Sequence, residues 1–191
     1  GQRIKQGGLV GHVIIAIGIV GILMALGQMV YLERVGRRMR AQLRNIHLPS
    51  IDNPLGRVLR VFGDDPAHRE DDPELLELRL SEAVLREMPP LERTQSILRL
   101  FAAAAPLLGL LGTVTGMIVT FQTITVFGTG DPKLMADGIS QALVTTVEGL
   151  VVAIPVLFIN ALLGTRSRAL IQILDEQSAG MLAQRLEAQR A

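Results

Sequence analysis

One carboxylate, Glu148, lies in an otherwise uncharged apolar segment, ALVTTVEGLVVAIPVL, at residues 142–157. Gln141, Thr145 and Glu148 are spaced at i, i+4 and i+7, so on a helix they share one face, and Thr146 lies on nearly the opposite side from Glu148. An ionisable side chain inside a membrane faces a helix bundle or water and is functional by default. We therefore predict that Glu148 binds and releases protons. The alternative is a structural, protonated carboxyl group that is bonded to a neighbouring helix.

A second apolar segment, LFAAAAPLLGLLGTVTGMIVTFQTITVFG, combines small and polar side chains. Gly109, Gly112 and Gly116 share one helix face, where small residues allow helices to approach closely in lipid. We favour this packing role over a pore wall, although both can hold in one assembly. Six polar side chains indicate a face that is wet or contacts another polar helix, unless the threonines bond to their own helix carbonyls. The six are Thr113, Thr115, Thr120, Gln122, Thr123 and Thr125.

Three charge-poor stretches must position these residues. Residues 6–32 and 100–130 contain no Asp, Glu, Lys or Arg, and residues 138–165 contain only Glu148. At 1.5 Å per residue, about 20 helical residues cross a bilayer core of about 30 Å. Buried core helices of a soluble protein would have to be unusually long to explain the pattern. The sequence thus predicts an all-α membrane protein with three transmembrane helices and long helical cytoplasmic extensions, assembled as an oligomeric helical bundle. Pro155 can kink the third of these helices because it lacks a backbone donor.

The distribution of arginines predicts how the chain is oriented. Five arginines follow the first span between residues 34 and 44, and Arg166 and Arg168 follow the third. Since basic residues mark the cytoplasmic ends of spans, we expect an external N-terminus and a cytoplasmic C-terminus. The first residue is Gly and not Met, so we expect a processed or truncated N-terminal segment. The expected segments are an external N-terminal segment (1–8), transmembrane helix 1 (9–32), a cytoplasmic helical segment (33–96), transmembrane helix 2 (97–128), a periplasmic loop (129–137), transmembrane helix 3 (138–165) and a cytoplasmic C-terminal helix (166–191).

Local signals predict where the helices start and stop. We expect breaks in LPSIDNPLG (48–56) and in GDDPAHREDDPE (63–74), and a further break at 88–91, where two prolines adjoin. Asp72 and Pro73 are expected to cap and open one helix, and Asp131 and Pro132 another.

Other kinds of site are excluded or unsupported. The absence of Cys excludes disulfides, thiol catalysis and Cys-based metal sites. His12, His47 and His68 are scattered, and GLLGTVTG lacks the Gly-Lys-Ser/Thr ending of a nucleotide-binding loop. We expect no enzymatic activity, no cofactor, no metal and no nucleic-acid partner.

The second and third predicted spans resemble the MotA/TolQ/ExbB family of proton-channel subunits. The resemblance rests on PLLGLLGTVTGMIVTF (106–121), FGTGDPKLMADG (127–138) and ADGISQALVTTVEGLVVAIPVL (136–157). The ExbB-type members, including extended TtpC-like variants, are the most similar. A MotA-type subunit is expected to have four spans and a different cytoplasmic domain.

The resemblance implies a set of partners and an activity. Family subunits form a pentamer around two membrane helices of an ExbD- or TolR-like partner, whose membrane Asp takes the proton. This implies an inner-membrane subunit that uses proton-motive force to energise a TonB-like protein for uptake across the outer membrane. The alternatives are a TolQ-like subunit for envelope maintenance, a non-conducting membrane scaffold and a self-sufficient transporter.

The resemblance also carries over individual residues. Thr113 and Thr146 match the two family threonines that would line the proton route. Gln141 lies where many ExbB and TolQ proteins carry Glu, so Glu148, two turns further along, either replaces that carboxylate or has a different role. The predicted proton-pathway residues are Glu148, Thr113, Thr146, Gln141, Thr145 and Thr120.

Overall fold

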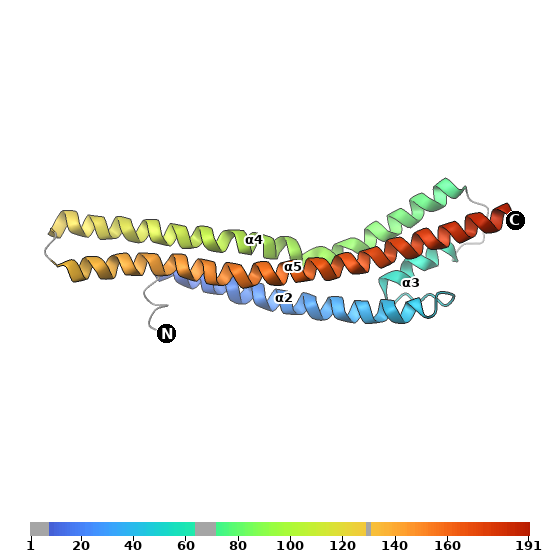
Figure 1. The fold of residues 1–191 in the computed structure, drawn as a ribbon, viewed down its shortest axis with the longest axis horizontal. Coiled ribbons are helices and arrows are strands. Elements are labelled where there is room, and N and C mark those ends of the chain that lie inside the picture. The colour runs from blue at the N-terminus through green and yellow to red at the C-terminus, as the bar shows by residue number, and fades with distance from the viewer. Residues whose placement is uncertain (1–7, 64–71, 129–130) are drawn as a thin grey trace. The chain divides into compact units, whose positions relative to one another are not determined.

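The computed structural model describes residues 8–63, 72–128 and 131–191, which form helices and no strands (Figure 1). The elements are α2 (Gly8–Leu43), α3 (Pro54–Leu59), the 3-10 helix η1 (Arg60–Phe62), α4 (Pro73–Phe127) and α5 (Pro132–Arg190). The predicted all-α fold class is confirmed. The helices α2, α4 and α5 are each long and apolar enough to cross a membrane.

The chain divides into two compact units, and each long helix contributes to both. The first unit comprises Gly1–Leu26 and Thr94–Leu162, and the second comprises Gly27–Arg93 and Leu163–Ala191. The segment boundaries predicted from charge and hydropathy stay predictions.

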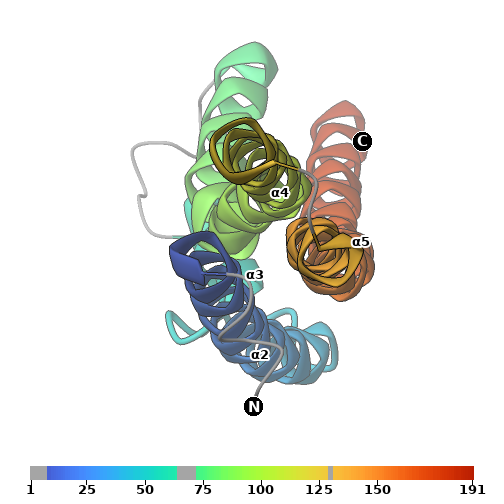
Figure 2. The ribbon, with the colours of Figure 1, turned by 90° about the vertical axis from the view of Figure 1, so that its left-hand side faces the viewer.

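In the first unit, α4 and α5 lie side by side and α2 packs beside them (Figures 1 and 2). Many of the buried side chains at this contact are small, which lets the helices approach closely. A methyl group at Gly21 of α2 would lie 3.4 Å from Phe101 Cδ2 and 3.6 Å from Val156 Cγ2. The buried apolar residues of this unit are Ile14, Ala25, Leu98, Ala102, Ala105, Ala142, Ala153 and Val156.

The second unit has a core of larger aliphatic side chains and a short capped helix. Asn53 caps α3, since its Oδ1 accepts a hydrogen bond of 2.7 Å from the backbone N of Gly56, and Pro54 takes the first helical position. Gly56 is buried against the backbone of Ser50, where no side chain fits. The predicted break at 48–56 is confirmed, because α2 ends at Leu43 and α3 begins at Pro54.

The long helices begin where the capping signals predict. The backbone N of Glu74 donates to Asp72 Oδ1 over 3.2 Å, and α4 starts at Pro73. The backbone N of Lys133 donates to Asp131 Oδ1 over 3.0 Å, and α5 starts at Pro132. Both caps supply an acceptor to a helix end that would otherwise leave donors unsatisfied.

The predicted break at 88–91 is wrong, since α4 continues through Pro89 and Pro90. The buried contacts at this turn stabilise the helix more than the loss of two backbone N–H groups destabilises it. Leu91 is fully buried, and the buried Gln28 of α2 donates from Nε2 to the carbonyl oxygens of Pro90 and Leu91, each over 3.2 Å. The helix α5 likewise continues through Pro155 and through Gly180.

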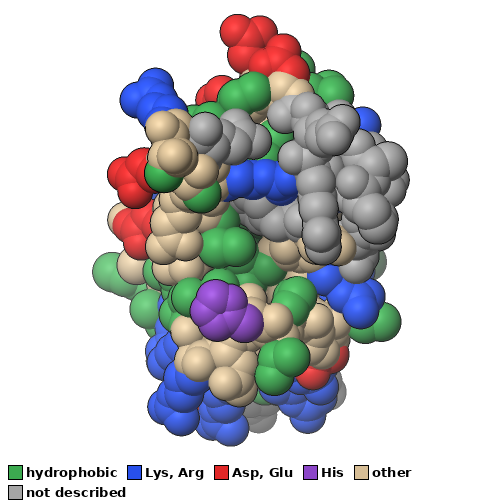
Figure 3. Space-filling view, turned by 90° about the vertical axis from the view of Figure 1, so that its right-hand side faces the viewer, with side chains coloured by type: hydrophobic (Ala, Val, Ile, Leu, Met, Phe, Trp, Pro, Cys, Tyr) green, Lys and Arg blue, Asp and Glu red, His purple; other side chains and the backbone are tan. Residues whose placement is uncertain are grey.

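Lys and Arg side chains gather along the lower edge of an end view of the molecule (Figure 3). The arginines that follow the first and third apolar segments are exposed. They are Arg34, Arg37, Arg38, Arg40, Arg44, Arg166 and Arg168.

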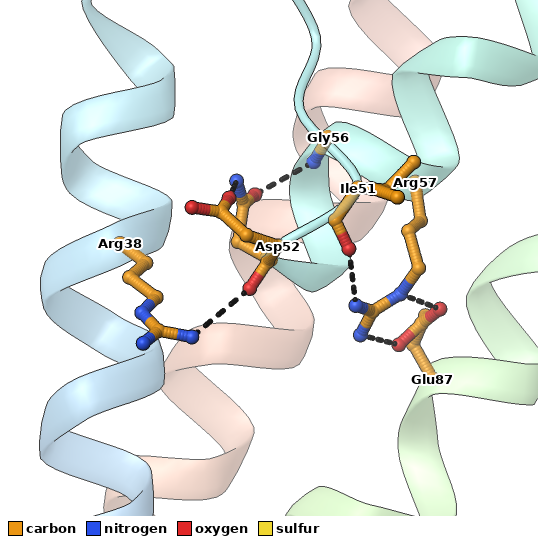
Figure 4. Close-up of polar contacts among 7 residues, drawn as sticks. Arg38, Ile51, Asp52, Gly56, Arg57 and Glu87 are labelled. Carbon is orange, nitrogen blue, oxygen red and sulfur yellow. Dashed lines mark hydrogen bonds and ion pairs between the residues drawn. The ribbon is translucent and has the colours of Figure 1, made fainter.

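One bidentate ion pair ties α3 to α4 in the second unit (Figure 4). Arg57 donates from Nε and Nη2 to the Glu87 carboxylate over 2.8 and 2.7 Å, and from Nη1 to the Ile51 carbonyl oxygen over 2.9 Å. The hydrogen bond to Glu87 raises the pKa of Arg57. Hydrogen bonds with Asn53 and Ser50 lower the pKa of the exposed Asp52 carboxyl group. The backbone carbonyl oxygen of Asp52 accepts a hydrogen bond of 3.4 Å from Arg38 Nη1.

We predict that Glu87→Gln loosens α3, because it removes the charge from this bidentate pair. The expected loss is roughly 1 kcal/mol, since Arg57 is partly open to solvent. Hydrogen exchange of residues 54–62 should accelerate. The matched control is Glu82→Gln, which breaks only an exposed i,i+4 pair with Arg86 and should leave that segment unchanged. Equal exchange in the two variants would contradict the role of the Arg57–Glu87 pair.

Candidate functional site

The helices α4 and α5 meet along a line of small residues, which we call the small-residue seam. A methyl group at Gly109 would lie 2.8 Å from the Thr145 carbonyl oxygen, and one at Gly112 would lie 2.5 Å from Thr145 Oγ1. At Gly116 the nearest atom would be Ala142 Cβ, at 2.8 Å. None of these positions has room for a side chain. The seam consists of Ala105, Gly109, Gly112, Gly116 and Thr120 of α4 and Gly138, Ala142, Thr145 and Gly149 of α5.

Three threonine hydroxyl groups gather at the middle of the seam, where they form a hydroxyl cluster of Thr113, Thr145 and Thr146. The Oγ1 atoms of Thr113 and Thr146 are in direct contact. Thr113 Oγ1 lies 3.0 Å from the Ala142 carbonyl oxygen, and Thr145 Oγ1 lies 3.1 Å from that of Gly109. Thr145 is buried, while Thr113 and Thr146 are half-buried.

The cluster offers more acceptors than it has protons. Each hydroxyl group carries one proton, yet Thr113 and Thr145 each lie within hydrogen-bonding distance of two carbonyl oxygens, and Thr146 lies near one carbonyl oxygen and the Thr113 hydroxyl group. The hydroxyl protons can therefore exchange between partners without any movement of the helices. An arrangement of this kind can pass hydrogen bonds along a chain and can coordinate water.

A cleft of about 620 Å³ opens between α4, α5 and the first residues of α2, and it reaches the hydroxyl cluster. Its polar lining includes Asp131 at the start of α5, the exposed Gln141, and Thr145. From Asp131 to Thr145 the helix rises about 21 Å at 1.5 Å per residue. Thr120 also lines the cleft, where its buried Oγ1 donates to its own helix, to the Gly116 carbonyl oxygen, over 3.0 Å.

Glu148 lies apart from this cleft. Its side chain is half-buried, and its Oε2 atom is buried with no hydrogen-bond partner among the residues that the structure describes. The carboxyl group lies against Gly11 of α2. The stripe of Gln141, Thr145 and Glu148 is thus divided, because the first two residues line the cleft and the third faces another helix.

Several other polar residues of α4 bond within their own helix. The Oγ1 atoms of Thr115, Thr123 and Thr125 donate to carbonyl oxygens four residues earlier, over 2.9 to 3.0 Å. These three side chains and Gln122 are exposed. Back-bonding to the helix, the alternative given above, accounts for these threonines.

Sequence reasoning missed Gly11, Gly138, Gly149 and Asn160. On α5 the small residues Gly138, Ala142, Thr145 and Gly149 recur at i, i+4, i+7 and i+11, a signal that matches the glycines of α4. Asn160 Oδ1 is buried without a partner among the described residues. Within residues 8–63, 72–128 and 131–191, no three His, Asp or Glu side chains gather as metal ligands would.

This fold and site define a multi-pass helical membrane protein in which two spans are joined by small residues around a polar cluster. The model of the MotA/TolQ/ExbB proton channel family matches residues 33–176. The chain therefore belongs to this family, and the predicted resemblance is confirmed.

Relatives with ExbB-type and TolQ-type names support the same assignment. A provisionally named biopolymer transport protein ExbB homologue of Methanothermobacter thermautotrophicus is 30% identical over 80% of this chain and 58% of its own length. The biopolymer transport protein ExbB of Xanthomonas campestris is 36% identical over 44% of this chain and 34% of its own. The Tol-Pal system protein TolQ of Haemophilus influenzae is 33% identical over 47% and 40%. The matched parts span less than two thirds of each relative.

We predict that Gly112→Ala destabilises the first unit, because the new methyl group would collide with the branched, buried side chain of Thr145. Overpacking of this kind typically costs about 1–3 kcal/mol. The matched control is Gly27→Ala, where a methyl group would meet nothing within 4 Å and helix propensity improves by about 0.5–1 kcal/mol. Thermal denaturation of the purified protein in bilayer discs measures the stability of both variants. A midpoint for Gly112→Ala at or above the wild-type value would contradict the close seam.

Proposed function

We propose that this protein is an inner-membrane proton-channel subunit of an ExbB–ExbD-type motor that energises a TonB-like protein for active uptake across the outer membrane. The observation that carries the proposal is the cleft that ends at the hydroxyl cluster, in a chain of the proton channel family. The cleft provides an approach along α5 that passes the polar side chains of Asp131 and Gln141, and the cluster provides hydroxyl groups that can exchange hydrogen bonds.

The proposed assembly is a homopentamer around membrane helices of an ExbD- or TolR-like partner with a membrane Asp. Its N-terminus is periplasmic and its C-terminus is cytoplasmic. Large apolar side chains on α4 and α5, such as Leu107, Leu110 and Val147, are exposed and suit contact with lipid or with further helices. Each elementary charge that crosses a membrane at 100 mV releases about 2.3 kcal/mol, so several protons would drive one mechanical step.

The proposed roles follow the positions of the side chains. Thr113, Thr145 and Thr146 hydrate the proton route or pass hydrogen bonds along it. Gln141 and Thr120 line its approach. Glu148 binds and releases a proton on a different face of α5. The protein itself makes and breaks no covalent bond.

A TolQ-like role in envelope maintenance is the second candidate, and the similarity to a TolQ protein favours it. Both roles use the same proton-driven membrane machinery. They differ in the partner outside the membrane, so deletion phenotypes separate them: loss of TonB-dependent uptake supports the first, and sensitivity to detergents supports the second.

We predict that Glu148→Gln and Glu148→Ala abolish or strongly reduce proton conduction by the assembled complex, because neither side chain can release a proton. The measurement is proton flux into vesicles that contain this protein and its one-span partner, together with uptake in cells. The complex must remain assembled by size-exclusion chromatography. Full activity in both variants would exclude the proposed role of Glu148.

We predict that Thr113→Val leaves the complex assembled but lowers conduction about tenfold or more, because the isosteric side chain keeps the packing and loses the hydroxyl group. The matched control is Thr125→Val on the same helix, which lies outside the cleft and whose exposed hydroxyl group donates to its own helix, to the Phe121 carbonyl oxygen. This control should conduct as the wild type does. If Thr113→Val instead abolishes assembly, the scaffold alternative is favoured over the channel.

A further inference from the structure

At the position of Glu148, an apolar side chain would stabilise the protein more than a carboxyl group does. Its Oε2 atom is buried and accepts no hydrogen bond from the described part of the chain. A buried polar atom without a partner lowers stability, and a buried charge lowers it further. The position is therefore explained by what the carboxyl group does and not by what it contributes to packing.

The first long helix, α2, lies beside this carboxyl group. A methyl group at Gly11 would lie 2.7 Å from Glu148 Oε2, 3.6 Å from Cδ and 3.7 Å from Oε1. Gly11 is itself buried. Glycine inside a helix is less stable than alanine, so its presence here requires a reason. The reason is that the Glu148 carboxyl group occupies the space that a side chain at position 11 would fill.

Within the described parts of the three helices, no charged side chain close in sequence to this site is available to pair with the Glu148 carboxyl group. Residues 100–127 of α4 contain no Asp, Glu, Lys or Arg, and residues 138–165 of α5 contain only Glu148 itself. On α2 the nearest titratable group is His12, which is exposed and whose Nδ1 donates to the Gly8 carbonyl oxygen over 2.7 Å. Thr146 of the hydroxyl cluster lies on nearly the opposite side of α5.

We infer that Gly11 is a positioning residue for the Glu148 carboxyl group, so that the first helix forms one wall of the proton-binding site. The inference rests on the proposed function only in taking Glu148 as the group that binds the proton. It adds that proton exchange takes place at the contact between α2 and α5, separately from the hydroxyl cluster between α4 and α5. The spacing of α2 and α5 at Gly11 then controls how readily Glu148 exchanges its proton.

The test is the rate at which dicyclohexylcarbodiimide, an apolar reagent for protonated carboxyl groups, modifies Glu148. The full-length protein is assembled with its one-span partner in bilayer discs, and the adduct is located by peptide mass spectrometry across a pH series. Glu148→Gln must show no adduct at this position. In the wild type, burial of the carboxyl group against Gly11 should keep modification slow.

Gly11→Ala is the informative variant, because its methyl group displaces only the far end of a flexible side chain. The helices can keep their packing while the carboxyl group moves out of its space. Modification should become several-fold faster. The matched control is Gly18→Ala, whose methyl group would lie 3.1 Å from Val152 Cγ1 and Cγ2. This variant adds a methyl group between the same two helices without contacting Glu148, so the rate of Glu148 modification should stay near the wild-type value.

A double variant guards against a general loosening of the protein. Glu148→Asp shortens the side chain by one methylene group, so in the Gly11→Ala background it makes room for the methyl group and should restore slow modification. Equal rates in the wild type and Gly11→Ala, or equal acceleration by Gly11→Ala and Gly18→Ala, would overturn the inference. Conduction by Glu148→Gln is scored separately: if it is unchanged, the proton role of Glu148 fails, whereas the labelling rates alone decide whether Gly11 positions the carboxyl group.

Discussion

The close approach of α4 and α5 is the contact on which the rest of the first unit depends. In lipid, apolar side chains gain little by leaving their surroundings, so helices associate through van der Waals packing and hydrogen bonds. Gly109, Gly112 and Gly116 permit both, because they bring the two backbones together. Carbonyl oxygens of Gly109 and Ala142 then come within reach of hydroxyl groups from the facing helix. The same small residues thus determine the packing and create the polar cluster.

The third long helix presents different chemistry on different sides. Toward α4 it presents small residues and hydroxyl groups, and toward the cleft it presents Gln141. Toward α2 it presents Glu148, whose carboxyl group fills a space that Gly11 leaves open. Under the proposed function, the hydroxyl cluster and the Glu148 carboxyl group both exchange protons, and the Oε2 atom of Glu148 has no hydrogen-bond partner among the described residues. The two groups lie on different faces of α5, the hydroxyl cluster beside α4 and the carboxyl group beside α2.

The second unit is held together by different interactions. Its core is built from larger aliphatic side chains, its short helix is capped by Asn53, and a bidentate pair joins Arg57 to Glu87. The turn at Pro89 and Pro90 illustrates the balance of forces. Local propensity favours a break there, but burial of Leu91 and two hydrogen bonds from Gln28 keep the helix continuous. Tertiary packing decides this case, although a proline in a helix interior costs about 3 kcal/mol or more.

The sequence by itself determined the three apolar helices, the caps at Asp72 and Asp131, the break at 48–56 and the family, because charge distribution, capping chemistry and motif spacing are local properties. It also grouped the glycines of α4 on one face and singled out Glu148. Helical periodicity gives the angle of a side chain about its own axis but not the identity of the neighbour it meets. Only the tertiary structure decided that Thr113 contacts Thr146 and that Gln141 lines the cleft while Glu148 does not. It also decided that Gly11 lies beside the Glu148 carboxyl group. These contacts depend on how three helices pack together, which no single segment specifies.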